Sequence, residues 1–299
     1  MKKILFLGCN SNQLPYLKIL KKMNFYLIGI DKNSNAPGLE FCDKCYNVGY
    51  DNYEKLIEIG KREKFSKYDN VFTASAQFAN YSAALFAEFF QISYPKPEKV
   101  QFCLDKVSYY KYFLKNNIPL PKTHFIKKES ELKSYIKNNP SQWYYLKSDY
   151  SKNPNYVYRI HSKSVDFSKI FWGKDRYLRN YYILQEECPG VSLRLNLYGS
   201  RFNVINFNNG LFTSDYKNEL KKFKVIEVLK ELIKFLGMNN WLIKFDIILN
   251  SKGFVLLDIG MDPPSRMLKK CIENNINFHQ FYLEQYLNNQ INYPIILDQ

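Results

Sequence analysis

Two aspartates lie in an apolar setting near the end of the chain, within KFDIILNSKGFVLLDIGMDPP at residues 244–264. Asp246 and Asp258 each belong to a run of apolar residues typical of a buried strand, and NSKG between the runs predicts a turn. Asp is depleted in strands and is rarely buried without a partner. Antiparallel pairing would bring both carboxylates to one face of a hairpin, where they are suited to hold a hard divalent cation such as Mg²⁺.

Two plainer explanations for these acids stay open. Asp246 and Asp258 can be surface acids on half-exposed strands. They can also form an ordinary ion pair with Lys244, which lies two residues before Asp246 and shares its face. The depletion of Asp from strands disfavours both explanations, so we predict metal binding first.

Chemistry based on cysteine or histidine is not favoured. The six cysteines are scattered along the chain, and Cys42 and Cys45 form a CxxC in a segment that we interpret as a loop, with no second CxxC and no nearby His. We therefore expect free thiols and no zinc. The three histidines are far apart in sequence, and no Ser or Cys lies in a G-x-S-x-G motif.

The chain carries a net charge of +15, and its 43 Lys and Arg accompany 25 Tyr and 23 Phe, a composition that could serve nucleic-acid binding. The excess is mostly Lys spread along the whole chain, so we expect no nucleic-acid partner and only an anionic ligand such as a nucleotide. No apolar run reaches about 18 residues, and the first segment has too short an apolar core for a signal peptide. These features predict a cytoplasmic protein without a membrane partner.

The first 97 residues have the pattern of an α/β domain. Strands are predicted at 3–8, 25–31 and 69–74, and helices at 14–23, 50–65 and 80–90. A β-loop-α-β start predicts a doubly wound parallel sheet. The loop after Gly8 lacks G-x-G-x-x-G, so dinucleotide binding has little support.

The rest of the chain reads as two α+β units. A helix begins at Asp105 and ends before Pro119. Strand pairs are predicted at 143–160 and 181–199, with further strands at 202–213. One helix is predicted at 218–237, ending at Gly237, and the hairpin and a mostly helical end from 265 follow.

The order of these elements resembles the ATP-grasp superfamily, the nucleotide-dependent ligases that include carbamoyl phosphate synthetase, biotin carboxylase and D-alanine:D-alanine ligase. FLGCN, GIDKNSNAPG and CDKCYNVGYDN look like a preATP-grasp domain, and DKVSYYKYFLKNNIPLPKT looks like the segment that follows it, with Asn117 where Gly is usual. The resemblance covers nearly the whole chain and identifies it as a divergent member. It implies a preATP-grasp α/β domain at 1–97 and two ATP-grasp lobes at 98–184 and 185–299, the second with the metal hairpin.

The resemblance also implies ATP and Mg²⁺ as cofactors. Asp246 and Asp258 match the acids that chelate Mg²⁺ between the β- and γ-phosphates. Lys106 and Lys147 match lysines that contact the α- and β-phosphates, and Lys244 matches an Arg that reaches the γ-phosphate. Making an acyl phosphate needs such neutralisation of charge on the transferred group.

The segment LQEECPG resembles the hinge that meets adenine in this superfamily. Main-chain groups from Glu186 through Glu187 to Cys188 would read the edge of the base, and Gln185 would lie beside the purine. The position that usually carries a ribose-binding Glu is Ser192, which is therefore the candidate for the ribose.

Other positions depart from the family pattern. Gly260 replaces an Asn that completes the metal site, and Asp262, two residues on, is the candidate substitute. Arg194 and Arg266 are candidates for substrate or phosphate contacts, since guanidinium binds carboxylate and phosphate bidentately. The loop at 148–155 contains no Gly, although a glycine-rich phosphate flap is expected there.

The resemblance implies an ATP- and Mg²⁺-dependent ligase that activates a small carboxylate as an acyl phosphate for attack by an amine. The loops after Gly8 and at 73–77 would line the acceptor side of the active-site cleft. Two alternatives remain open: a phosphotransferase on the same fold, and a nucleotide-binding protein that has lost catalysis. The expected partners are a small-molecule carboxylate and amine, and the frequency of dimers among similar proteins suggests a homodimer.

Overall fold

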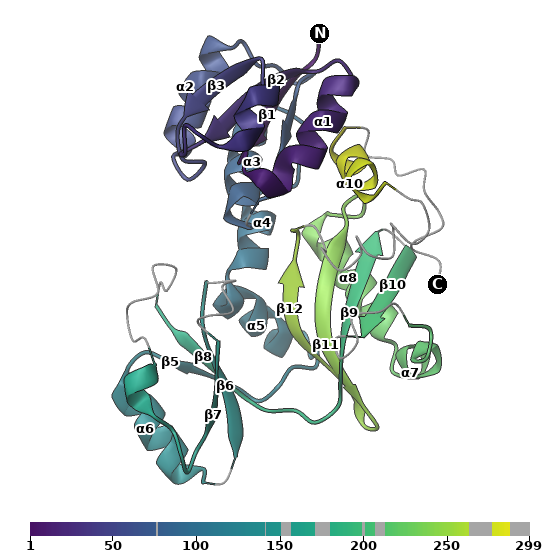
Figure 1. The fold of residues 1–299 in the computed structure, drawn as a ribbon. Helices are drawn as coiled ribbons and strands as arrows, with labels where there is room; N and C mark the ends of the chain where they lie inside the picture. Colours follow the sequence, from purple (N-terminus) through teal and green to yellow (C-terminus); the bar gives the residue numbers. More distant parts are fainter. Residues whose placement is uncertain are drawn as a thin grey trace.

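Three four-stranded sheets organise the chain in a computed structural model (Figure 1). The structure describes residues 1–75, 77–140, 142–150, 157–170, 180–198, 201–206, 213–262 and 277–287. The first sheet belongs to an α/β domain, and the other two are antiparallel and lie below it in Figure 1. This mixed α/β architecture is the predicted fold class.

The first sheet has the strand order β3-β2-β1-β4, and all neighbouring strands are parallel, which confirms the prediction for this segment. Cys45 lies in β3, so the loop predicted there is wrong. The strand is short and mostly exposed, and it lacks the apolar alternation that predicts strands. Its elements are β1 (Lys3–Leu7), η1 (Ser11–Gln13), α1 (Leu14–Lys22), β2 (Tyr26–Asp31), η2 (Pro37–Phe41), β3 (Lys44–Asn47), α2 (Tyr53–Arg62), β4 (Asn70–Phe72) and α3 (Gln77–Phe90).

The second sheet has the order β5-β8-β6-β7 and is antiparallel throughout. It packs against α6 around its own apolar core, which includes Leu132, Leu146 and Leu184. The predicted domain boundary at 184/185 falls inside β8 of this sheet. Its elements are β5 (Thr123–Ile126), α6 (Glu129–Asn138), β6 (Trp143–Ser148), β7 (Val157–His161), η4 (Phe167–Lys169) and β8 (Tyr182–Glu186).

The third sheet is also antiparallel and has the order β10-β9-β11-β12. The single helix predicted at 218–237 is wrong, because Lys224 adopts a left-handed conformation (φ +52°) and separates two helices. Gly237 ends the second helix at φ +67°, as predicted. Its elements are β9 (Val191–Tyr198), β10 (Arg201–Asn206), α7 (Lys217–Lys222), α8 (Val225–Leu236), β11 (Ile243–Asn250) and β12 (Gly253–Gly260).

Three helices connect these units: α4 (Pro97–Leu104), α5 (Lys106–Lys115) and α10 (Phe278–Leu287). Figure 1 shows α4 and α5 leading from the first domain to the other sheets, whereas α10 lies against α1. The ring centroids of Tyr16 and Tyr282 lie 6.1 Å apart, and those of Phe72 and Tyr286 lie 4.7 Å apart. The late helix α10 therefore completes the core of the first domain.

One apolar core joins the first domain, α5 and the third sheet, while the second sheet keeps a separate core. Within the residues described above, no helix has the length and apolar character needed to cross a membrane. The five described cysteines form no disulfide with one another. Of the predicted helical end, α10 is helical, and residues 263–276 lie outside the described part of the chain.

Candidate active site

The hairpin of β11 and β12 holds the two acids that the sequence singled out. Asp246 and Asp258 are direct cross-strand partners, so their side chains lie on the same face of the sheet. The register shifts by one residue immediately after Asp246, between Asp246 and Ile247. The predicted proximity of the two carboxylates is confirmed.

Arg194 on β9 is the cross-strand partner of Asp246 on its other side. The guanidinium donates a hydrogen bond to each carboxylate oxygen: Nε lies 2.7 Å from Oδ1, and Nη2 lies 2.8 Å from Oδ2. The two side chains are only 14% and 19% exposed. Burial opposes the charge of Arg194, but the hydrogen bonds and the charge of Asp246 outweigh it and raise the pKa of Arg194.

A second ion pair lies two residues further along the same strands. Lys244 is the partner of Asn196 on β9 and of Gly260 on β12. Its Nζ contacts Oδ2 of Asp262, which follows β12. The sequence analysis proposed Asp262 as a substitute metal ligand in place of Gly260, and that role stays a prediction.

Helix α5 brings two tyrosines that the sequence analysis missed. The hydroxyl of Tyr109 donates to Oδ1 of Asp258 at 2.8 Å, and the hydroxyl of Tyr110 donates to the carbonyl of Leu257 at 2.6 Å. Burial, followed by the charge of Asp258, raises the pKa of Tyr109 well above its usual value, so it remains a donor at neutral pH. The pair of adjacent tyrosines in α5 was the sequence signal that could have revealed these contacts, because a buried Tyr hydroxyl needs a hydrogen-bond partner.

The same helix links the two antiparallel sheets. Nζ of Lys147, on β6, donates to the hydroxyl of Tyr110 at 2.7 Å. That hydroxyl also lies 3.3 Å from Oε1 of Gln185 on β8, whose Nε2 donates to Thr123 at 2.9 Å. Candidate residues from both sheets therefore meet at α5, close to the hairpin acids.

Lys106 begins α5 and is only 4% exposed. Its backbone N–H donates to the carbonyl of Asp149 at 2.8 Å. The carboxylate of Asp149 in turn accepts from the amides of Asn180 and Tyr181, both at 2.9 Å. These bonds hold the start of the loop predicted at 148–155, of which residues 151–155 lie outside the described part.

No protein-family model matches the chain, and no curated protein matches it. Solved structures do match over nearly its whole length. Phosphoribosylglycinamide synthetase from Anaerococcus prevotii has 19% identity and a TM-score of 0.64, covering 96% of this chain and 75% of that one. L-amino acid ligase from Bacillus licheniformis has 14% identity and a TM-score of 0.70, covering 96% and 74%.

A third match is the biotin carboxylase domain dimer of 2-oxoglutarate carboxylase from Hydrogenobacter thermophilus, in complex with MgADP, ADP and bicarbonate. It has 12% identity and a TM-score of 0.73, and the match covers 98% of this chain and 71% of that one. The chain has the ATP-grasp fold. Its division into parts at 97/98 and 184/185 stays a prediction.

The segment predicted as the adenine hinge of the ATP-grasp fold begins in the last residues of β8 and continues beyond it. The amides of Glu186 and Glu187 donate to the carbonyls of Lys122 and Trp143, at 3.0 and 2.9 Å. Their side chains form ion pairs with Lys122 and Arg159. Among the described residues, the amide of Cys188 donates to no backbone carbonyl, unlike the amides of Glu186 and Glu187.

The structure describes two of three further regions that were predicted to belong to the ATP-grasp site. Ser192 is half-buried on β9, opposite Ile248, and Arg266 lies outside the described part of the chain. The predicted acceptor loops lie together, because the hydroxyls of Thr73 and Ser75 both donate to the carbonyl of Leu7, at 3.0 and 3.2 Å.

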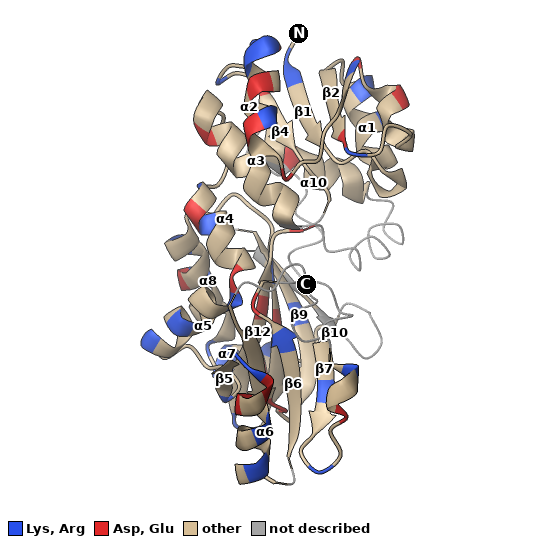
Figure 2. Cartoon of the chain, turned by 90° about the vertical axis from the view of Figure 1, so that its left-hand side faces the viewer, with Lys and Arg blue, Asp and Glu red and all other residues tan. Residues whose placement is uncertain are grey.

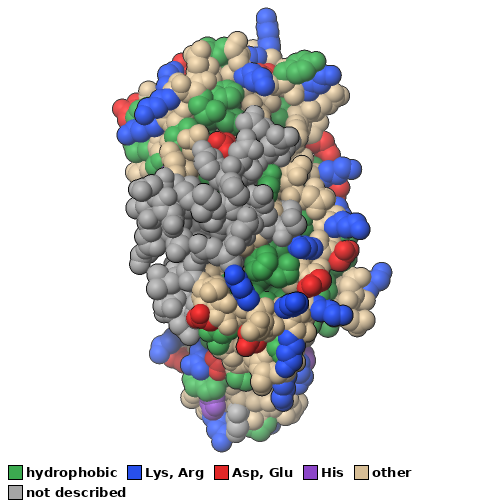
Figure 3. Space-filling model, turned by 90° about the vertical axis from the view of Figure 1, so that its right-hand side faces the viewer, with side chains coloured by type: hydrophobic (Ala, Val, Ile, Leu, Met, Phe, Trp, Pro, Cys, Tyr) green, Lys and Arg blue, Asp and Glu red, His purple; other side chains and the backbone are tan. Residues whose placement is uncertain are grey.

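Acidic and basic side chains lie close together at the hairpin, where Arg194 pairs with Asp246 and Lys244 with Asp262. Figure 2 shows acidic and basic positions close together in the sheet that carries β9 and β12. On the face in Figure 3, Lys and Arg are scattered among polar and acidic side chains. Among the described residues, no three His, Cys, Asp or Glu side chains are placed to hold a metal ion by themselves.

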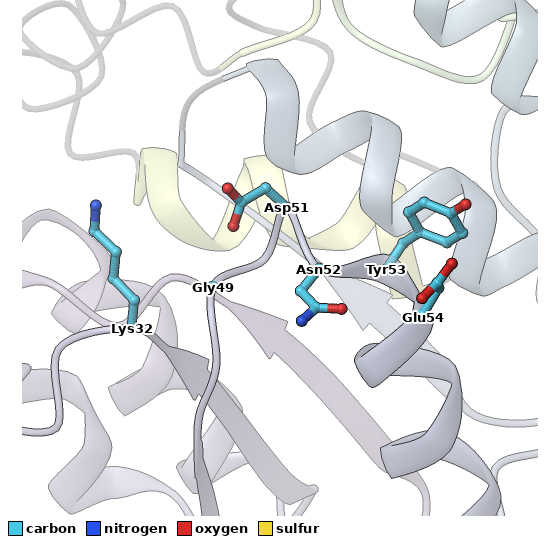
Figure 4. Close-up of a pocket in the computed structure, with 6 residues that line it drawn as sticks. All are labelled: Lys32, Gly49, Asp51, Asn52, Tyr53 and Glu54. Carbon is cyan, nitrogen blue, oxygen red and sulfur yellow. The ribbon is translucent and has the colours of Figure 1, made fainter.

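A surface pocket lies apart from this site, in the first domain beside the start of α2 (Figure 4). It contains none of the predicted site residues. Its lining mixes both charges, with Lys32, Gly49, Asp51, Asn52, Tyr53 and Glu54. We therefore place the candidate active site at the hairpin and α5.

Proposed function

We propose that this chain is an ATP-dependent ligase that activates a small carboxylate as an acyl phosphate for attack by an amine. The observation that carries the proposal is the meeting of the hairpin and α5. There Asp258 bonds Tyr109, while Lys147 from the second sheet bonds the neighbouring Tyr110. Groups suited to a nucleotide thus converge from both antiparallel sheets, on a fold shared with ligases of this kind.

The lysines would neutralise the phosphates of the nucleotide. Lys106 begins α5, Lys147 on β6 donates to Tyr110 of the same helix, and Lys244 lies on β11 of the hairpin. Phosphoryl transfer depends mainly on positioning and on electrostatic stabilisation, so a fixed set of ammonium groups suits it. The amide of Cys188 and the carbonyl of Glu186 would contact adenine, beside the buried Gln185, with Ser192 near the ribose.

Asp258 fits a magnesium ion that is shared with the nucleotide. Mg²⁺ in nucleotide sites is usually bound through one or two carboxylates plus phosphate oxygens and water. The hydrogen bond from Tyr109 is neutral, so it orients the carboxylate without adding positive charge beside it. Bound Mg²⁺ would supply charge neutralisation at the transferring phosphoryl group.

The acceptor side would be formed by the loops after β1 and β4. The hydroxyls of Thr73 and Ser75 hold these loops together on the carbonyl of Leu7. In open α/β sheets, ligands bind outside the carboxyl ends of the strands, which is where these loops lie. A small carboxylate and an amine would meet the nucleotide from this side.

The test is ADP release from ATP and Mg²⁺ with pooled small carboxylates and amines. A ligase releases ADP only when both a carboxylate and an amine are present, and Asp258→Asn abolishes the release. Asp43→Asn, a partly exposed acid of the first domain, is the matched control and should leave it unchanged. ADP release that needs no amine would indicate a phosphotransferase, and nucleotide binding without turnover would indicate a binding protein.

A further inference from the structure

Three cysteine side chains meet in the first domain, whereas the candidate active site lies at the hairpin and α5. Cys9 follows β1, Cys42 lies between η2 and β3, and Cys45 lies in β3. We propose that Cys42 is a site of reversible oxidation, where its thiolate reacts with a peroxide and the sulfenic acid formed then makes a disulfide with Cys9. The inference concerns thiol chemistry and does not depend on the proposed function.

A glycine in β2 makes room for the Cys42 sulfur. An ideal Cβ at Gly29 would lie 2.5 Å from Sγ of Cys42, so a side chain at this position would displace the thiol. Gly29 is also the direct cross-strand partner of Cys45. Sγ of Cys9 lies 4.0 Å from the carbonyl oxygen of the next residue, Ile30. The three cysteines therefore gather beside the same short stretch of β2.

Hydrogen bonds between the thiols make Cys42 different from its two neighbours. The thiols of Cys9 and Cys45 both donate to the sulfur of Cys42. The bond from Cys9, together with that from Cys45, lowers the pKa of Cys42 against the opposing effect of burial. The charge of Lys21 acts in the same direction as these bonds, and that of Asp43 opposes them.

The two donors remain protonated. The bond to Cys42 and burial raise the pKa of Cys9, which is fully buried. Burial and the charge of Cys42 raise the pKa of Cys45, which is exposed. Because the thiolate is the reactive form of cysteine, the half-buried Cys42 is the nucleophile of the group.

The chemistry is a two-electron oxidation by a peroxide, with hydrogen peroxide as the simplest case. The Cys42 thiolate attacks one peroxide oxygen, so that an S–O bond forms, the O–O bond breaks and hydroxide leaves. The sulfur of Cys9 then attacks the sulfenic sulfur. An S–S bond forms, the S–O bond breaks, and the hydroxyl group leaves as water with the proton of the Cys9 thiol.

Cys9 is better placed than Cys45 to complete this disulfide. Cys9 and Cys42 both lie outside the helices and strands, so their sulfurs can move from hydrogen-bond contact to bonding distance. Cys45 is held in β3 by the pairing of that strand with β2. Of the two thiols that donate to Cys42, that of Cys9 also has the larger effect on it.

The experiment maps disulfides in the reduced full chain after addition of one equivalent of hydrogen peroxide, alkylation of the remaining thiols and digestion with trypsin. Cleavage after Lys44 puts Cys42 and Cys45 on different peptides, 33–44 and 45–55. We expect a disulfide between the peptides 4–18 and 33–44. A disulfide between 33–44 and 45–55, or an oxidised Cys42 without any disulfide, would overturn the inference.

Cys188 provides a matched comparison within the same chain. It is also half-buried, but burial and the charges of Glu186 and Glu187 raise its pKa. Iodoacetamide at neutral pH should therefore alkylate Cys42 about tenfold faster than Cys188 in the folded chain, and at a similar rate in concentrated urea. Equal rates in the folded chain would show that Cys42 is not an activated thiol.

Two serine variants separate the roles of the other thiols. Cys9→Ser should form no disulfide and should leave Cys42 as a sulfenic acid that dimedone traps, whereas Cys45→Ser should still form the disulfide. A folded Cys45→Ser chain without the disulfide would contradict the assignment of Cys9. The peptide map of the wild-type chain decides the pairing even where a variant fails to fold.

Discussion

Two bidentate Arg–carboxylate ion pairs in this molecule have the same chemistry in different surroundings. We call them the inner fork (Arg194 and Asp246) and the outer fork (Arg159 and Glu187). Arg194 holds Asp246 at 2.7 and 2.8 Å in the third sheet, and Arg159 holds Glu187 at 2.9 and 3.0 Å at the edge of the second. The first pair is 14% and 19% exposed, and the second is 49% and 29% exposed. Geometry alone does not set how much an ion pair contributes to stability, because water screens the outer pair more than the inner one.

Each fork also has an aromatic environment that matches its exposure. Near the inner fork, the cross-strand neighbour Asp258 accepts from the buried Tyr109. At the outer fork, Glu187 accepts from Tyr145 at 3.2 Å, and the guanidinium of Arg159 lies 3.9 Å from the ring centre of Trp143. The inner fork therefore belongs to a largely buried network of charged groups, and the outer fork belongs to a cluster at the surface.

The largest expected difference comes from removing the two arginines. Arg194→Ala leaves Asp246 in a site with little water and should lower the free energy of unfolding by about 2–4 kcal/mol. Arg159→Ala should lower it far less, because its partners remain solvated. Urea denaturation of both variants checks this, and equal losses would contradict the comparison.

A smaller difference is expected from the two tyrosines. Tyr109→Phe removes a buried hydrogen bond to the Asp258 carboxylate and should cost about 2 kcal/mol. Tyr145→Phe removes the matching bond to Glu187, where water replaces it, and should cost much less. Urea denaturation of the two Phe variants measures the difference; a larger loss for Tyr145→Phe would mean that the outer cluster is the more desolvated one.

The smallest effect concerns pH. The hydrogen bonds and charge of Arg159 hold the pKa of Glu187 below its usual value, with burial opposing them. A lowered folded-state pKa adds stability above the unfolded pKa of about 4.3, and this stability is lost as pH falls through the folded value. Arg159→Gln should raise the pKa of Glu187 and move acid unfolding slightly upward.

Carboxyl NMR titration of Glu187 in the wild-type chain and in Arg159→Gln measures the pKa directly. Circular dichroism between pH 5 and 2 follows the unfolding. An unchanged Glu187 pKa in the variant would show that another group lowers it.

Elements with strong local signals could be predicted from the sequence. The hairpin followed from two apolar runs around NSKG, and its acids face one another. The helix after Asp105 was also predictable, because the carboxylate caps the amides of Val107 and Ser108, at 3.0 and 3.2 Å. The parallel first sheet followed from its β-loop-α-β pattern.

The partners of the site acids could not be predicted, because they depend on strand register and helix docking. Arg194 lies 52 residues before Asp246, and Tyr109 lies 149 residues before Asp258. A shift of one residue in the pairing of β9 and β11 would turn the guanidinium to the other face. The break at Lys224 was missed because Lys favours helices and rarely adopts positive φ.

The docking of α10 on the first domain has a consequence for synthesis of the chain. The hydroxyl of Tyr286 lies 3.4 Å from Oδ1 of Asn80, a residue made 206 positions earlier. On the ribosome, the nascent first sheet therefore lacks the cover that Tyr282 and Tyr286 give to Phe72 until α10 emerges. The α/β domain made first reaches its final packing last, and chaperones have an apolar surface to protect during that interval.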